Sequence, residues 1–132
     1  MVATLPLVQA FPADCSALGD IRRFIHARAR EASLPAEESD DLELAVTEAC
    51  RDMLAHERSS FMFVSWWAHD GAVEIRVRDE DVIEVRDDDG SGAEDAFRFP
   101  YILAFVDEFA LRPGTSDHPG TTIRLVKEMS AA

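Results

Sequence analysis

Apolar residues recur every three to four positions in two stretches of the first half of the chain. The first stretch covers residues 15–32 and follows Asp14, a favourable N-cap residue. The second covers about residues 36–57 and begins with several acids, which the helix dipole favours at that end. Its apolar stripe consists of Leu42, Val46, Ala49 and Met53. The pattern therefore predicts two amphipathic helices.

Elsewhere the period shortens to two, which is typical of β-strands. Residues 4–11 predict a first strand, and residues 61–68 and 72–79 predict a hairpin around a His-Asp-Gly turn. In residues 72–79, Val73, Ile75 and Val77 alternate with Glu74, Arg76 and Arg78, so one face should be buried and the other wet.

The rest of the chain predicts shorter elements. Residues 82–85 suggest a further strand, residues 87–95 an acidic loop, and residues 99–109 a short helix. Two last strands, FALR and GTTIRLVKEM, flank a Pro- and Gly-containing turn. This order favours an α+β two-layer sandwich, with a mixed, mostly antiparallel sheet and its helices on one face. The length of 132 residues fits a single domain over residues 1–132.

Composition narrows the classes of partner and the compartment. The formal net charge is −13, which disfavours nucleic acid and anionic membrane surfaces and favours a protein with a basic patch. No signal peptide and no membrane-spanning apolar run is apparent, so we expect a cytoplasmic protein. The two cysteines, Cys15 and Cys50, fall within predicted helices, where a buried free thiol is the ordinary interpretation.

Candidate chemistry lies on the second helix. Glu48 and Asp52 are one turn apart, on a face beside the apolar stripe, where a cleft could use their carboxylates. They could equally be solvated acids at the rim of an amphipathic helix. His56 continues the row, so a metal site of Glu48, Asp52 and His56 is a further alternative.

Several segments resemble the anti-sigma-factor serine-kinase branch of the GHKL (histidine-kinase-like) ATPase superfamily. They are FPADCSALGDIRRFIHARARE, DDLELAVTEACRDMLAH, the strand ending RVRDE, and VDEFALRPG with GTTIRLVK, which together span roughly residues 8–127. The resemblance implies a cytoplasmic regulator with a two-layer fold that often forms a homodimer. It also implies Mg-ATP binding, a bound sigma factor, and phosphorylation of a serine on a small STAS-domain antagonist.

The resemblance assigns roles to individual positions. Glu48 matches the helix glutamate that acts as general base, and Asp79 matches the aspartate that binds the adenine amino group. Thr121 stands where the family has a threonine entering the last strand. Asp52 replaces the asparagine that coordinates magnesium, and its carboxylate can still bind Mg²⁺.

The departures concern glycines that make room for the nucleotide. The family motif DxGxG would begin at Asp79, but its glycines are replaced by Asp81 and Ile83. The phosphate-binding glycine pair falls near Ala96 and Arg98, and Arg98 is the one cation there that could hold phosphate. Seven acids between residues 79 and 89, opposed by a single arginine, would also repel a triphosphate.

Three hypotheses follow from these observations. The first is a degenerate family member that acts by binding proteins, with weakened or lost ATP binding. The second is an active Mg-ATP-dependent serine/threonine kinase of a STAS-domain antagonist, in which Glu48, Asp52 and Asp79 keep their roles. The third is a small-molecule sensor whose aromatic side chains line the abandoned nucleotide pocket. Those aromatics are Trp66, Trp67, Phe97, Phe99 and Tyr101.

Overall fold

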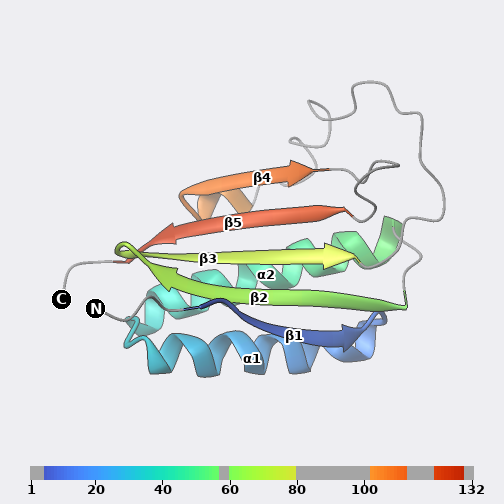
Figure 1. Ribbon diagram of the computed structural model, residues 1–132, viewed down its shortest axis with the longest axis horizontal. Helices are drawn as coiled ribbons and strands as arrows, with labels where there is room; N and C mark the ends of the chain where they lie inside the picture. The colour runs from blue at the N-terminus through green and yellow to red at the C-terminus, as the bar shows by residue number, and fades with distance from the viewer. Residues whose placement is uncertain (1–4, 57–59, 80–101, 113–120, 130–132) are drawn as a thin grey trace.

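A computed structural model describes residues 5–56, 60–79, 102–112 and 121–129. The described residues form five strands, two α-helices and two short 3-10 helices. In chain order they are β1 (Leu7–Pro12), η1 (Cys15–Ala17), α1 (Leu18–Glu31), α2 (Ala36–His56), β2 (Phe61–His69), β3 (Ala72–Asp79), η3 (Ile102–Ala104), β4 (Glu108–Arg112) and β5 (Thr122–Glu128). Figure 1 shows α1 and α2 side by side on one face of the sheet.

The sheet has the strand order β1-β2-β3-β5-β4, and each described pair of neighbours is antiparallel. β1 and β4 are therefore its edges. The predicted α+β two-layer fold with helices on one face is confirmed. The sheet was expected to be mixed and mostly antiparallel, and its described part is antiparallel throughout.

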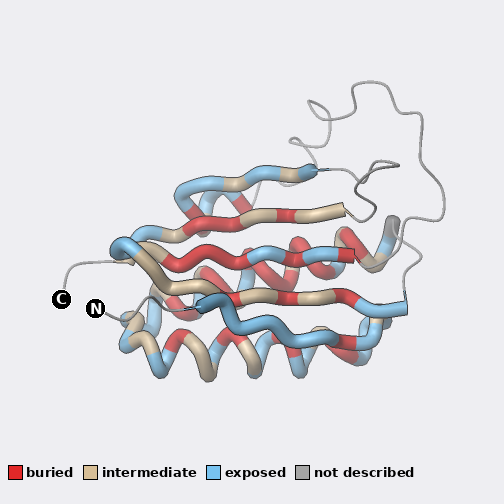
Figure 2. The backbone as a smooth tube through the Cα atoms, viewed as in Figure 1, coloured by how far each residue is buried: buried red, intermediate tan, exposed pale blue. Residues whose placement is uncertain are grey.

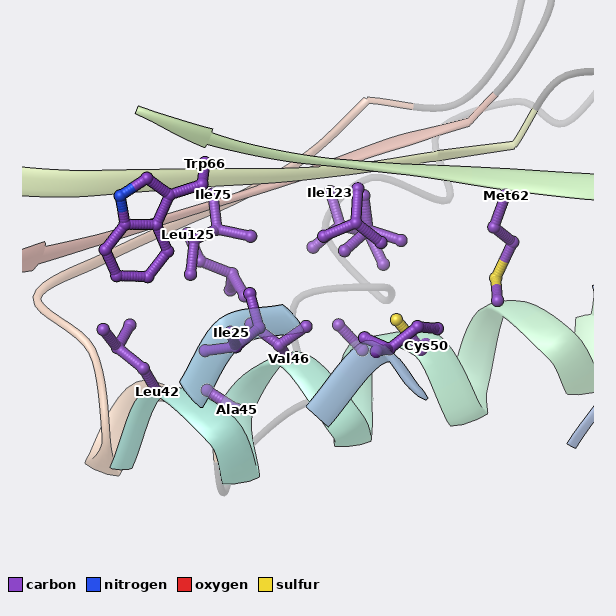
Figure 3. Close-up of a cluster of buried hydrophobic side chains, with 14 of the residues drawn as sticks. Ile25, Leu42, Ala45, Val46, Cys50, Met62, Trp66, Ile75, Ile123 and Leu125 are labelled. Atoms are coloured by element: carbon purple, nitrogen blue, oxygen red, sulfur yellow. The ribbon is translucent and has the colours of Figure 1, made fainter. Parts of the chain in front are cut away.

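The core fills the space between the two layers. Ile25 of α1, Val46 of α2, Ile75 of β3 and Leu125 of β5 are all completely buried. Figure 3 shows these side chains meeting between the strands and the helices. The predicted stripe of α2 is confirmed, because each of its four residues is at most 2% exposed. The three central strands, β2, β3 and β5, contribute alternate residues to this core, as period-two patterning requires.

Local signals explain where the elements begin and end. The Asp14 carboxylate accepts a hydrogen bond from the Ser16 amide at 2.8 Å, so the cap starts a 3-10 turn that leads into α1. Ser33 follows the end of α1 with a φ of 60°. The hairpin turns at Asp70 and Gly71, with φ angles of 52° and 74°, which is the sign that a tight two-residue hairpin turn needs.

One predicted element was wrong in extent. Residues 99–109 were expected to form a helix, but the described part contains only the 3-10 turn η3, and Glu108 and Phe109 belong to β4. This segment pairs with β5 instead of forming a helix: the Asp107 amide donates a hydrogen bond to the Val126 carbonyl at 2.8 Å. The Asp107 carboxylate then accepts the Glu128 amide at 2.7 Å. Residues 82–85 and 87–95 lie outside the described residues.

Two further observations concern the cysteines and the membrane. Cys15 is exposed, so the expectation that both thiols are buried was wrong for this residue, which sits at the outer start of η1. Cys50 is buried, and burial raises the pKa of its thiol to about 12, so it is unreactive near neutral pH. Within the described part of the chain, no helix has the length and apolar character to cross a membrane.

Candidate functional site

The predicted site residues of α2 lie on the flank of its buried stripe. Ala45 and Ala49 are completely buried, whereas Glu48 and Asp52 are intermediate between buried and exposed. A helix places residues i and i+4 one above the other, so both carboxyl groups face the same way along the rim. The edge position that the sequence predicted for these acids is therefore confirmed, while their chemical roles stay predictions.

Glu48 is paired with a neighbouring cation. Its carboxylate forms an ion pair with Arg51, three residues along the same helix, and the two side chains are 45% and 54% exposed. Ion pairs at this level of exposure contribute at most about 1 kcal/mol. Arg51 can thus release Glu48 at little cost, which a general base at this position would require before accepting a proton from a hydroxyl group.

Asp79 occupies the end of β3 on the helix side of the sheet. It is completely buried, and it continues the inward-facing series of Val73, Ile75 and Val77. Its backbone amide donates to the Thr121 carbonyl at 3.0 Å, so the structure brings these two predicted site residues together. Its register partner on β2 is Met62, which Figure 3 shows above the later turns of α2. Asp79 and Thr121 therefore lie at the end of the sheet that faces the Glu48–Asp52 half of α2.

The other predicted site residues are not all described. Arg98, Asp81, Ile83 and Ala96 lie outside the described residues, as does the side chain of His56. Among the side chains that the structure does describe, no three His, Cys, Asp or Glu residues are grouped closely enough to hold a metal ion.

The aromatic sensor pocket is not supported by the tryptophans. Trp66 is 5% exposed and belongs to the core, and its neighbour Trp67 points to the opposite face of the sheet. On that opposite face Trp67 stacks on His69, with ring centroids 3.7 Å apart. The two side chains consequently cannot line one pocket. Phe97, Phe99 and Tyr101 lie outside the described residues.

Sequence reasoning missed two polar clusters. Glu43 joins the helices: one carboxylate oxygen lies 3.0 Å from His26 Nδ1 of α1 and accepts from the Ser39 hydroxyl at 3.3 Å. On the sheet face away from the helices, Glu74 is 6% exposed although the pattern predicted a wet position. The signal that could have indicated its burial is the arginines at outward positions of its own strand, β3, and of the neighbouring strand β5. Arg76 Nε lies 2.7 Å and Arg124 Nη2 3.1 Å from its carboxylate.

These contacts set the ionisation of Glu74. Burial alone would raise its pKa, but hydrogen bonds from Arg124 and Arg76, reinforced by their charges, outweigh burial and hold the pKa below its ordinary value. Glu74 is therefore a carboxylate at neutral pH, and it neutralises one of two guanidinium groups that face each other across β3 and β5.

Comparison with known proteins places the fold in a family. No curated protein matches the sequence. One similar solved structure contains the RsbU and RsbW domains of Rv1364c from Mycobacterium tuberculosis. The two share 19% sequence identity and a TM-score of 0.71, over 96% of this chain and 32% of the other, so this chain spans about a third of that protein's length.

The sequence profile of the histidine kinase-like ATPase domain matches residues 11–130, nearly the whole chain. The chain therefore belongs to the histidine kinase-like ATPase domain family.

Proposed function

We propose that this protein is a cytoplasmic regulator of the anti-sigma-factor branch that works by binding proteins, with weakened or lost ATP binding. Its partners would be a sigma factor, a STAS-domain antagonist, or both, and it would act as a homodimer and a single domain. The likeness of its fold to a structure that contains an RsbW domain supports the choice of branch.

The main support for this proposal is that four glycines of the resembled branch are missing, whereas the acidic residues on α2 and at the end of β3 are retained. The chain has Asp81 and Ile83 where the resembled branch has glycine, and the phosphate-binding glycine pair of that branch falls near Ala96 and Arg98. A glycine lets backbone approach a ligand closely, whereas a Cβ and a longer side chain occupy that space. The helix flank and the strand end, in contrast, keep acidic residues in register.

The described residues fit Mg-ATP only in part. The carboxylate of Asp52 offers the oxygen ligands that a magnesium ion prefers, but Glu48, Asp52 and Asp79 are not grouped closely enough to form a three-carboxylate site. A triphosphate also needs cations or free backbone amides, and Arg51, the cation described at this flank, is paired with Glu48. If magnesium and ATP do bind, Asp52 would hold the ion, and Asp79 and Thr121 would contact the nucleotide.

Isothermal titration of the full chain with Mg-ATP tests the proposal. We expect no heat of binding at micromolar nucleotide, because side chains replace the four glycines. Mg-ADP and Mg-GTP serve as matched ligands that separate specific adenine recognition from general phosphate affinity. Saturable micromolar binding of Mg-ATP would overturn the degenerate site.

The alternative is an active serine/threonine kinase, favoured by the acidic register of Glu48, Asp52 and Asp79. Radiolabelled ATP, this protein and a STAS-domain protein should then yield phosphoserine, and Glu48→Gln should abolish the label. Asp52→Asn is the sharper variant, since restoring an amide at a magnesium-binding position should preserve or increase activity. Absence of label in the wild-type chain would exclude the kinase.

A further inference from the structure

The face of the sheet opposite the helices is organised in rows. Because strands alternate their side chains, Glu74, Arg76 and Arg78 of β3 point away from the core formed by Val73, Ile75 and Val77. The strand register aligns each of these outward residues with outward residues of the neighbouring strands. We call the outward positions of all five strands the open face.

The β1–β2 half of the open face lacks charge. Its described residues include no Asp, Glu, Lys or Arg: they are Val8, Ala10, Pro12, Phe61, Phe63, Ser65, Trp67 and His69. Val8 is 62% and Phe61 is 45% exposed, which is unusual for apolar side chains of this size gathered on adjacent strands. Figure 2 shows β1 exposed along most of its length. We call this region the apolar half.

The β3-β5-β4 half is charged, with the two signs separated along the strands. One row runs Arg78–Thr122–Arg112 and the next runs Arg76–Arg124–Ala110. The following row runs Glu74–Val126–Glu108, and the last contains Ala72 and Glu128. Four arginines thus occupy two adjacent rows, and three glutamates occupy the two rows beyond them. We call this region the charged half.

We propose that the open face is the interface of the homodimer, formed by a second copy of this chain packed face to face about a two-fold axis that crosses the strands. Such an axis places the apolar half on the partner's apolar half. It also reverses the rows, so that arginine rows of one copy lie over glutamate rows of the other. A two-fold axis along the strands would instead set charged residues on apolar ones and superimpose rows of like charge.

This pattern selects a second copy over other occupants. An isologous interface must be self-complementary. The open face meets this condition across the strands, where apolar half lies on apolar half, and along the strands, where arginine rows lie on glutamate rows. A purely acidic partner would match the arginine rows but would oppose the three glutamates. Five strands about 4.8 Å apart and four rows about 7 Å apart give a projected area of several hundred Å², which suits a reversible dimer of modest affinity.

The inference rests on the homodimer of the proposed function, and it concerns the face away from Glu48 and Asp52. Arg112 and Glu128 provide the test, since both are exposed and the two-fold axis brings the Arg112 row over the partner's Glu128 row. Arg112→Glu and Glu128→Arg should each weaken self-association by about tenfold, because each contact occurs twice and the substitution reverses its sign. Arg22→Glu, an exposed position on α1, makes the same charge change away from the open face and should have no effect.

Mixing the two variants gives the decisive measurement. In a heterodimer of Arg112→Glu with Glu128→Arg, both contacts pair opposite charges: one has its two charges exchanged, and the other is the same as in the wild type. Sedimentation equilibrium over a wide concentration range should therefore show that the mixture associates as well as the wild type, while each variant alone does not. Circular dichroism confirms that both variants are folded.

The outcomes separate this inference from the proposed function. A wild-type chain that stays monomeric overturns both the interface and the homodimer, but leaves the nucleotide titration to be decided by itself. A dimer that is indifferent to both substitutions overturns only the interface. A mixture that associates no better than the single variants also overturns it, because the row reversal would then be wrong.

Discussion

Replacing Glu74 by glutamine should destabilise the protein by about 2 kcal/mol at neutral pH. Arg76 and Arg124 are direct partners across β3 and β5, and like charges in that position repel each other. Glu74 separates them with hydrogen-bonding contacts of 2.7 and 3.1 Å, and its own side chain is 6% exposed. The glutamine keeps the size of the side chain but removes the charge that offsets this repulsion.

The magnitude follows from the exposure of the partners. Breaking a fully buried ion pair costs about 3–5 kcal/mol, and an exposed pair contributes at most about 1 kcal/mol. Arg76 is 54% and Arg124 36% exposed, so two half-exposed pairs around a buried acid should fall between these limits. For a chain of this length, a loss of 2 kcal/mol corresponds to a fall in Tm of about 6–10 °C.

Urea unfolding at one fixed, low protein concentration measures the effect, since self-association would add to apparent stability. The double variant Glu74→Gln/Arg124→Gln is the control, and it should lose less than the sum of its single changes because the repulsion with Arg76 disappears too.

The pH dependence has a defined sign. The folded-state pKa of Glu74 is lowered from an ordinary value of 4.5, so its contribution is complete above that pH and is lost as pH falls through the folded pKa. The stability difference between wild type and Glu74→Gln should thus shrink below about pH 4.5. A loss under 0.5 kcal/mol, or a difference that acid leaves unchanged, would refute this account.

Three further predictions concern Gly71 in the hairpin turn, Lys127 of β5, and the glycines that are missing from the nucleotide motif. Gly71→Ala should cost about 1 kcal/mol in urea unfolding because φ is 74° there, whereas Gly19→Ala within α1 should stabilise; equal effects would contradict this reasoning. Lys127→Met should cost about 1–2 kcal/mol, because Nζ donates at 2.9 Å to a backbone carbonyl just after η3, while Lys127→Arg should cost less. Asp81→Gly combined with Ile83→Gly should raise Mg-ATP affinity in calorimetry at least about tenfold, and no change would show that these side chains do not block the nucleotide.

The parts of the fold that sequence predicted are those governed by local periodicity. The stripe of α2 and the alternation of Val73, Ile75 and Val77 both reflect burial against a single opposing layer, so each period reveals the buried face. The segment around Glu108 could not be predicted in this way. Its apolar residues fit a helix, but pairing with β5, the next strand along the chain, extends β4 back to Glu108.

The same distinction applies to the candidate site. The positions of Glu48 and Asp52 beside the stripe follow from one helix and were predictable. The contact between the Asp79 amide and the Thr121 carbonyl depends on how β3 and β5 pair, which no local pattern encodes. The burial of Glu74 likewise depends on Arg124, which reaches it from β5.

The charge of −13 is unevenly distributed, and this asymmetry separates two kinds of binding surface. Helix α2 carries seven carboxylates and one arginine, whereas the charged half of the open face carries four arginines against three glutamates. A basic partner would thus be attracted to α2, while a second copy fits the face behind it. Because the sheet lies between these surfaces, a charge change on one should leave the other intact. A regulator built in this way could lose nucleotide binding at the α2 flank and still keep both its partner and its homodimer.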